Sequence, residues 1–518
     1  MYTGYAVLLI SRIPRCDEQK ELSKRFERFD LQELIRTALD VSDGSRYLLG
    51  GLTQQSFHID DGSGVEVSAK LPNPSAGPAR YTTASEVATY DMLREMFKVP
   101  VSRILAWSAN ATNNPVGAEY IIQEKVQGVR LGSLWNQWPR KAKLDLIKQV
   151  VDMEIKLTTM VFPWHGCIYY KNDLLSLTGD AKALTVDSVA PEALEHFAIG
   201  PLTSAELWTG ARKDMKLDRG PWLNPIQYTH ALGKNEIAWI KSHAKSRMNY
   251  YRSMEDQEHP EDGLALLTQY MDAASYLIPS SDDEAASSNV LWHPDLHVDN
   301  VFVDPDTHEI KSIIDWQSAC VAPLFYQSGV PRMAQHTGPV REGWVVPQKP
   351  GNFDSLSEEE QNEIQKNLES ETMHIYYEAQ KTVPIMRKLV CLVTGVWERR
   401  NLFFLRQSLI VLAAYWEEVS SDSGLTCPVQ VTKTDLELYS EEEENIDGVG
   451  QLLTILHDQA LLPHDGMIRS EDYEAAVKIS QKIKEISLGW LKTKLRESYF
   501  PSSGHIKRRR INGCDRPR

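Results

Sequence analysis

The chain has 518 residues, enough for a domain of roughly 300 residues with extensions or for two to three lobes. Apolar residues make up 42% and charged residues 25%, which is typical of globular proteins and excludes wholesale disorder and collagen-like or coiled-coil architecture. The formal net charge of -15 repels phosphate backbones, so we expect a small-molecule substrate and no nucleic acid.

Cysteine usage and hydropathy narrow the class further. Six cysteines are scattered without a C-x-x-C pair, which predicts reduced thiols rather than a disulfide framework. No stretch approaches the roughly 20 apolar residues that span a bilayer, so we expect no integral membrane association. The segment up to Cys16 contains Arg12 and Arg15 but no acid, a weak match to a mitochondrial presequence that leaves targeting open.

In the first part of the chain, helical spacing over 30–40 is followed by strand-like runs. The pattern predicts three antiparallel strands, at 47–49, 56–59 and 65–70. A helix over 82–97 and two further strands, at 101–107 and 119–126, follow. The pair Gly50 and Gly51 falls in the first predicted turn. We therefore expect a small sheet interrupted by one helix.

After Gly128 the pattern becomes mainly helical. Helices are expected over 141–160, 264–277 and much of 358–416, and short strands over 289–292, 301–303 and 310–314. The acidic run Glu441 to Glu444 predicts a solvated boundary before a last helical pair. The basic tail that contains Lys507 to Arg510 is expected to be disordered.

The motif HPDLHVDN, from His293 to Asn300, is followed by a predicted hairpin and then by IIDWQ, which contains Asp315. Phosphoryl transfer from ATP needs a carboxylate that orients the attacking hydroxyl and oxygen ligands that hold magnesium against the phosphates. Asp295 is the candidate catalytic base, and Asn300 and Asp315 are the candidate metal ligands. A hairpin brings such residues together, so this segment predicts a kinase-type site.

The same segment admits a second interpretation. His293, Asp295, His297 and Asp299 alternate, which could place several ligands on one strand face, as in a zinc or iron hydrolase. Such a site usually recruits further histidines, whereas the downstream partner here is an aspartate. Under the kinase interpretation His293 is a structural loop residue, and His297 and Asp299 line the cleft.

These motifs resemble those of the aminoglycoside phosphotransferase, choline kinase and fructosamine kinase superfamily. HPDLHVDNVFVDP, IIDWQSA and VAPLFYQSGVPR together are similar to the fungal "altered inheritance of mitochondria" phosphotransferase-like family. The similarity extends over about 29–495 and includes TTASEVATYDML, NPVGAEYII and DRGPW. The resemblance implies a kinase-like fold, ATP and Mg²⁺ as cofactors, and a mitochondrial location, with the cytoplasm as the alternative.

The resemblance also implies positions for the remaining site residues. Lys70 matches the lysine that such folds direct at the α- and β-phosphates, and Glu86 matches its ion-pair partner. The backbone of a linker formed by Gln123, Glu124 and Val126 would meet the adenine, as their order along the chain implies. Gly50 and Gly51 would close over the phosphates, but here the chain has LGGLTQQ where the family tends to carry an EGGFN-like stretch, which puts efficient use of ATP in doubt.

We therefore expect an α+β, bilobal, protein-kinase-like fold with a small antiparallel N-lobe containing one helix and a large, mainly helical C-lobe. The predicted parts are a targeting or disordered segment (1–28), a nucleotide-binding N-lobe (29–126) and a catalytic C-lobe (127–430). A helical extension (431–500) and a disordered tail (501–518) follow. The predicted activity is ATP- and Mg-dependent transfer of the γ-phosphoryl group to an alcohol group of a small molecule. A catalytically weak, kinase-like binding or scaffold protein is the alternative, and the acceptor and oligomeric state stay open.

Overall fold

The computed structural model describes residues 28–42, 48–53, 56–60, 66–74, 76–186, 189–249, 257–278, 287–336, 338, 347–378, 393–399, 402–420, 425–458, 478, 479 and 481. The chain divides into two compact units, Met1–Lys20 with Glu444–Arg518, and Glu21–Glu443. All residues predicted for the site belong to the second unit. The segment considered for targeting and the basic tail lie outside the described residues, and the predicted lobe boundaries stay predictions.

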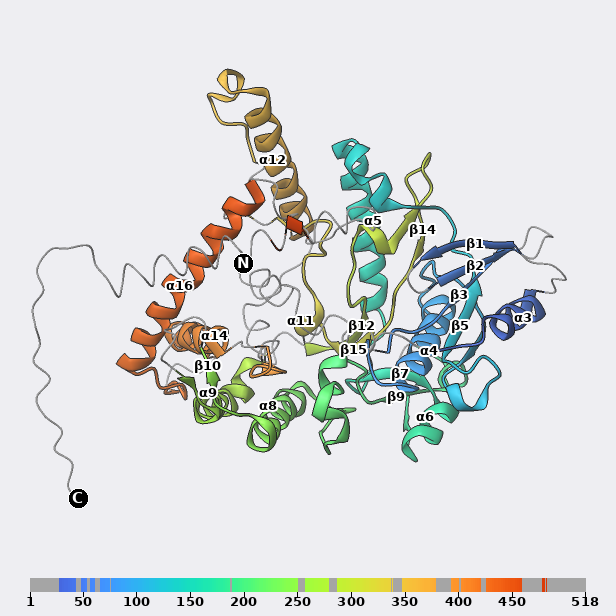
Figure 1. The fold of residues 1–518 in the computed structure, drawn as a ribbon, viewed down its shortest axis with the longest axis horizontal. Coiled ribbons are helices and arrows are strands. Elements are labelled where there is room, and N and C mark those ends of the chain that lie inside the picture. The colour runs from blue at the N-terminus through green and yellow to red at the C-terminus, as the bar shows by residue number, and fades with distance from the viewer. Residues whose placement is uncertain are drawn as a thin grey trace, which may run out of the picture. The chain divides into compact units, whose positions relative to one another are not determined.

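An antiparallel five-stranded sheet forms the first part of the larger unit, in the order β1-β2-β3-β5-β4. Its strands are β1 (Leu48–Thr53), β2 (Ser56–Asp60), β3 (Glu66–Lys70), β4 (Ile104–Ser108) and β5 (Tyr120–Glu124). The helix α4 (Tyr81–Glu95) comes between β3 and β4, and both α4 and α3 (Leu31–Ser42) lie against the sheet (Figure 1). The predicted order of sheet, helix and sheet is confirmed.

The predicted amphipathic helix over 30–40 is confirmed as α3. Asp30 caps it, because its carboxylate accepts hydrogen bonds from the backbone N–H groups of Gln32 and Glu33 at 2.9 and 3.1 Å. Its apolar face packs against β3 and β5 in a small core of buried side chains. That core includes Leu34, Ile35, Ala38, Val67, Ala69 and Ile122.

The glycine pair was expected in the first turn, and that placement is wrong. Gly50 and Gly51 lie inside β1, where the register between β1 and β2 shifts between Leu49 and Leu52. Glycine is favoured at such irregularities because the extra residue needs an unusual backbone conformation. The local pattern of a glycine pair does not distinguish a turn from a bulge.

Four smaller sheets complete the larger unit within the described residues. Their strands are β6 (Val129–Arg130), β7 (Cys167–Tyr170), β8 (Lys182–Ala183), β9 (Phe197–Gly200), β10 (Arg247–Met248), β11 (Gln257–Glu258), β12 (Asn289–Trp292), β13 (Val301–Val303), β14 (Ile310–Ile313) and β15 (Cys320–Pro323). The hairpin β13–β14 and the strand β12 confirm the prediction for this region. The pairing of β12 with β15 was not predicted from the sequence.

Helices make up most of the remainder, as the sequence predicted. They are α5 (Arg140–Thr158), α6 (Lys171–Thr178), α7 (Pro191–Leu194), α8 (Pro225–His243), α9 (Pro260–Ala273), α11 (Leu324–Gln327), α12 (Glu358–Glu378), α14 (Leu402–Ala414), α15 (Trp416–Val419) and α16 (Lys433–Asp458). Both α8 and α9 begin with proline in the first turn, after Asn224 and His259 respectively, whose side chains accept a backbone N–H.

The acidic run Glu441 to Glu444 contains the boundary between the two compact units, but it is only partly exposed to solvent. It lies inside α16, and the side chain of Glu442 is buried. Glu442 accepts hydrogen bonds from Arg406 at 2.6 Å and from Asn249 at 2.8 Å. A buried carboxylate needs such partners. Because both partners come from distant elements, the composition of the acidic run alone did not indicate that Glu442 is buried.

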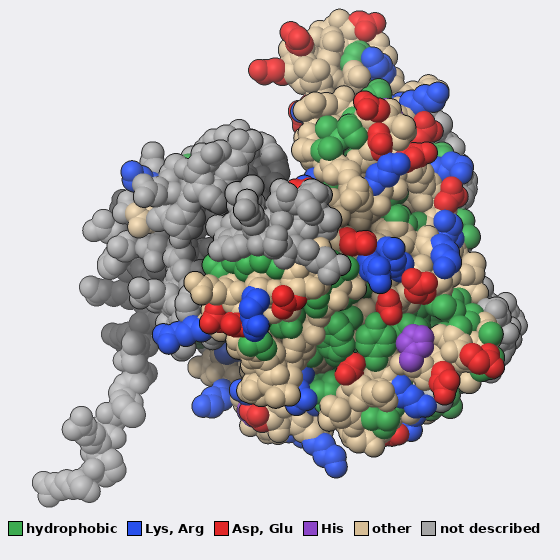
Figure 2. All heavy atoms as spheres, turned by 90° about the vertical axis from the view of Figure 1, so that its right-hand side faces the viewer, with side chains coloured by type: hydrophobic (Ala, Val, Ile, Leu, Met, Phe, Trp, Pro, Cys, Tyr) green, Lys and Arg blue, Asp and Glu red, His purple; other side chains and the backbone are tan. Residues whose placement is uncertain are grey.

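The site rests on a core between α5 and the β12–β15 region. Leu146 and Val150 of α5 belong to one buried cluster with Leu291, Val301 and Trp316. Among the described residues, no helix is both long and apolar enough to cross a membrane. On the side of the molecule that carries α3, Figure 2 shows hydrophobic side chains between scattered acidic and basic ones, so neither charge dominates that face.

Candidate functional site

His293 connects the HPDLHVDN loop to the strand that precedes Asp315. Its Nδ1 accepts the backbone N–H of Asp295 at 3.1 Å, so the ring proton is on Nε2, which donates to the carbonyl of Ile314 at 2.9 Å. Burial lowers the pKa of His293 to about 4, which keeps the ring neutral. His293 therefore fixes the positions of Asp295 and Asp315 relative to each other.

Asn300 adds a second connection within the loop. The side-chain NH₂ group of Asn300 donates to the backbone carbonyl of Asp295 at 3.0 Å. The backbone carbonyl of Asn300 accepts the backbone N–H of Ile314 at 2.9 Å. The side chain is buried. Since the amide nitrogen is already used, the amide oxygen of Asn300 is the atom that a cation could bind.

Asp315 follows β14 in a left-handed backbone conformation, with φ of 65°. Aspartate tolerates this region better than most residues, and such conformations often occur at functional sites. The backbone N–H of Asp315 donates to the hydroxyl of Tyr90 on α4 at 3.2 Å. The sequence predicted the helix that carries Tyr90 but did not indicate that its hydroxyl would contact the site.

Lys70 lies between two carboxylates. Its Nζ is 2.7 Å from Glu86 on α4 and 3.3 Å from Oδ1 of Asp315. Burial opposes the charge of Lys70, but Glu86 and Asp315 outweigh this effect and raise the pKa of the ammonium, which stays protonated. The ion pair expected between Lys70 and Glu86 is thus present, and Lys70 also joins the sheet to the loop after β14.

The carboxylate of Asp295 faces two nitrogen donors. Nη2 of Arg332 lies 3.2 Å from Oδ1 and 3.5 Å from Oδ2, and Nε2 of His297 lies 3.9 Å from Oδ2. Nδ1 of His297 accepts the backbone N–H of Asp299 at 3.2 Å. Arg332 belongs to the motif VAPLFYQSGVPR, but nothing in that sequence indicated that it would reach Asp295.

Glycines let neighbouring segments approach the loop closely. A Cβ at Gly132 would collide with the carboxylate of Asp299, and a Cβ at Gly128 would lie 2.7 Å from the carbonyl oxygen of Val303. Gly128 also has a positive φ of 90°. The chain between β5 and α5 therefore packs directly on the HPDLHVDN segment.

The residues predicted for the linker and the phosphate turn lie around β3. Gln123 and Glu124 end β5, which pairs with β3, and Gln123 is opposite Ser68 in the ladder. Val126 follows in the irregular chain before β6. Gly50 and Gly51 belong to β1, and β2 separates that strand from β3 in the sheet.

The donor atoms fit magnesium better than zinc or iron. The side chains of Asn300 and Asp315 carry hard oxygen atoms, and Mg²⁺ is commonly held by one or two protein ligands plus substrate phosphates. Both ring nitrogens of His293 are engaged by backbone groups. Within the part of the chain that the structure describes, no cluster of three His, Cys, Asp or Glu side chains could hold a metal ion. Among the described residues, the alternating His and Asp side chains therefore do not gather into the cluster that a metallohydrolase site needs.

DRGPW, the other motif singled out, is a braced loop. Arg219 donates to the carbonyls of Leu207 and Arg212 at 3.1 and 2.6 Å, and its guanidinium lies 3.9 Å from the ring centre of Trp208. These contacts use the cation to hold the surrounding loop together.

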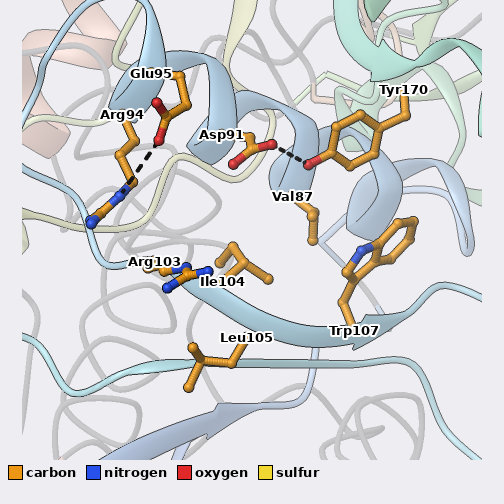
Figure 3. Close-up of a pocket in the computed structure, with 9 residues that line it drawn as sticks. All are labelled: Val87, Asp91, Arg94, Glu95, Arg103, Ile104, Leu105, Trp107 and Tyr170. Carbon is orange, nitrogen blue, oxygen red and sulfur yellow. Dashed lines mark hydrogen bonds and ion pairs between the residues drawn. The ribbon is translucent and has the colours of Figure 1, made fainter. Parts of the chain in front are cut away.

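A cavity of about 440 Å³ lies beside α4. Its lining comes from α4, the chain into β4 and the end of β7: Val87, Asp91, Arg94, Glu95, Arg103, Ile104, Leu105, Trp107 and Tyr170. Figure 3 shows Asp91 and Tyr170 pointing toward each other, and the Tyr170 hydroxyl donates to Asp91 at 2.8 Å. None of the residues predicted for catalysis lines this cavity, but its wall is the helix that carries Glu86 and Tyr90.

Comparisons with known proteins show which proteins this chain resembles. The sequence pattern of the phosphotransferase enzyme family matches residues 233–327, which include Asp295, Asn300 and Asp315. A subtelomeric hrmA-associated cluster protein of Aspergillus fumigatus is 31% identical over 82% of this chain and 88% of its own length. Altered inheritance of mitochondria protein 9, mitochondrial, of Saccharomyces cerevisiae is 23% identical over 76% of this chain and 69% of its own.

Solved structures show a more distant similarity. A thermostable mutant of the aminoglycoside phosphotransferase APH(4)-Ia, in a ternary complex with AMP-PNP and hygromycin B, aligns with 73% of this chain and 98% of its own. The sequence identity is 12% and the TM-score is 0.32.

Proposed function

Since this chain belongs to the phosphotransferase enzyme family, we propose that it transfers the γ-phosphoryl group of ATP to a hydroxyl group of a small molecule. The observation that carries the proposal is the position of Lys70, which pairs with Glu86 on one side and Asp315 on the other. A kinase-type site needs an ammonium for the phosphates next to a carboxylate for the metal. A two-lobed arrangement, with the five-stranded sheet as the nucleotide lobe, belongs to the same proposal.

Each residue has one task in this proposal. Asp295 accepts a hydrogen bond from the attacking hydroxyl and orients it, while Lys70 steadies the phosphates and Glu86 positions Lys70. Asn300 and Asp315 would hold Mg²⁺, which neutralises phosphate charge when bound. The backbone of Gln123 to Val126 would meet the adenine, and Gly50 and Gly51 would lie over the phosphates.

The reaction balances without a further reactant. The acceptor oxygen forms a bond to the γ-phosphorus, and the bond from that phosphorus to the bridging oxygen of ADP breaks. The hydroxyl proton passes to Asp295 and then to solvent. His293 is neutral and buried and takes no proton in this scheme. It keeps Asp295 in place because its Nδ1 accepts the backbone N–H of Asp295.

The experiment combines nucleotide binding with turnover. Calorimetry with ATP, with and without Mg²⁺, should show metal-dependent binding, and labelled ATP should lose its γ-phosphoryl group to an acceptor or to water. Asp295→Asn should reduce turnover by about 10³-fold or more, because the group that orients the nucleophile is lost. Turnover equal to that of the unaltered protein would remove Asp295 from the mechanism.

A kinase-like binding or scaffold protein is the second candidate. It is favoured by the LGGLTQQ sequence, in which the glycine pair lies at a register shift inside β1, and by Arg332, which occupies the Asp295 carboxylate. Tight, metal-dependent binding with turnover would exclude it. Binding without turnover under all acceptors would support it.

We also propose a mitochondrial location, supported by the name of the Saccharomyces cerevisiae relative, with the cytoplasm as the alternative. Fractionation of cells that express the full chain, followed by protease protection of isolated mitochondria, tests it. Recovery in the cytosolic fraction alone would contradict it.

A further inference from the structure

Arg332 contacts the predicted catalytic base from a fixed position. It follows Pro331 in a turn closed by the Ala334 N–H, which donates to the Pro331 carbonyl at 2.9 Å. The next two side chains, Met333 and Ala334, are buried in two different apolar clusters. The backbone of Arg332 is therefore anchored, while its side chain is 67% exposed.

The guanidinium of Arg332 is only partly used. Nη2 contacts both oxygens of Asp295, and among the described residues no partner is recorded for Nε or Nη1. Arginine carries five N–H donors in a planar fork that matches carboxylate and phosphate oxygens. The remaining donors can therefore begin to bind the oxygens of a second anion.

The ion pair itself is easily exchanged. Asp295 is 47% exposed, and an ion pair between exposed side chains contributes little to stability. A structural brace would be expected to be better buried, as the Arg406–Glu442 pair is. An incoming anion at this position loses little by displacing the contact between Arg332 and Asp295.

We propose that Arg332 is the binding group for an anionic acceptor, so that the substrate is an alcohol that carries a carboxylate or a phosphate ester near its reactive hydroxyl. This inference rests on the proposed function, because Asp295 faces the acceptor only in that scheme. Binding of the anion draws the guanidinium from Asp295 and leaves the carboxylate free to accept the hydroxyl hydrogen. Lys70 lies against Asp315 and Glu86, and serves the nucleotide. The two cations thus serve two different anions.

The test uses four probes with a common three-carbon skeleton: glycerol, glycerate, glycerol 3-phosphate and 3-amino-1,2-propanediol. Transfer from γ-labelled ATP and binding by calorimetry are measured for each with the full chain and Mg²⁺. We expect the anionic probes to have KM or Kd values at least about tenfold below those of the neutral and cationic probes, since charge-assisted contacts are stronger. Glycerate and glycerol 3-phosphate then distinguish a carboxylate from a phosphate acceptor.

Arg332→Gln should raise the KM or Kd of the preferred anion by roughly 10- to 100-fold and change the KM for ATP less. Arg332→Lys, which keeps the charge but loses the fork, should recover part of the loss. Arg36→Gln is the matched control, because it removes a similarly exposed guanidinium that pairs with Glu33 on α3. It should leave the acceptor constants unaltered.

The outcomes separate this inference from the proposed function. Absence of metal-dependent ATP binding and of turnover would defeat the proposed function. If ATP binds but the anionic probes are neither bound more tightly nor used better than the neutral and cationic probes, Arg332 does not bind an anionic acceptor. The inference is also overturned if Arg332→Gln changes the KM for ATP alone.

Discussion

Nζ of Lys70 lies 3.3 Å from Oδ1 of Asp315, although the two residues are 245 positions apart in the chain. The contact joins β3 of the five-stranded sheet to the residue after β14. Tyr90 of α4 reinforces it, because its hydroxyl accepts the backbone N–H of Asp315. The helix α4 therefore positions both members of the pair, Lys70 through Glu86 and Asp315 through Tyr90.

Replacement of Asp315 by Ala should weaken metal-dependent nucleotide binding, because it removes one of the two candidate oxygen ligands for Mg²⁺. The measurement is the increase in melting temperature that ATP with Mg²⁺ produces beyond ATP alone. We expect this increase to disappear in the variant. Asp306→Ala, in the exposed turn between β13 and β14, is the control and should keep it. Retention of the full increase by Asp315→Ala would exclude Asp315 as a ligand.

Glu86→Gln should lower kcat/KM for ATP by roughly 10- to 100-fold, since the neutral amide no longer holds the Lys70 ammonium by charge. The side chain keeps its size, but the largely buried Lys70 ammonium loses its nearest counter-charge, so the melting temperature should fall together with turnover. Glu95→Gln, on the face of α4 that lines the cavity of Figure 3, serves as control. Equal kinetic effects of the two substitutions would argue against a specific role for Glu86.

His293→Phe should destabilise the loop by about 1–3 kcal/mol, because the backbone N–H of Asp295 and the carbonyl of Ile314 both lose their partner. Urea unfolding at neutral pH measures the change. Turnover should fall as well, since both Asp295 and Asp315 depend on this ring for position. A variant with full stability would show that solvent or neighbouring groups replace the two bonds.

Local patterns predicted the elements of the site but few of its contacts. The apolar runs of β12 and β13 and the helical repeat of α4 are short-range signals, so these elements could be located from the sequence. The hydroxyl of Tyr90 and the guanidinium of Arg332 meet the site only after distant segments pack together. The same is true of Glu442, whose partners Arg406 and Asn249 lie on other parts of the chain. No periodicity encodes such pairings.

His165 provides a test of pH dependence away from the site. The ring is buried against Trp222, Tyr228 and Tyr326, and neither nitrogen has a hydrogen-bond partner among the described residues. Burial lowers the pKa of His165 to about 3, against an ordinary value near 6.5. The unfolded chain therefore binds a proton that the folded chain does not bind between about pH 6.5 and pH 3.

Because the unfolded state holds more protons in this window, stability must fall as the pH is lowered through it. Between pH 6.5 and pH 4, His165 should lower the free energy of unfolding by about 3 kcal/mol, at 1.36 kcal/mol per pH unit. His165→Phe keeps a ring of similar size and has no proton to bind, so it should flatten the dependence of unfolding free energy on pH between 6.5 and 4. Urea unfolding at several pH values measures this slope.

At pH 7 the variant should be at least as stable as the unaltered protein, because two unpaired buried nitrogens are removed. An unchanged slope would mean that His165 is protonated in the folded protein, and hence that an acidic or carbonyl partner reaches it.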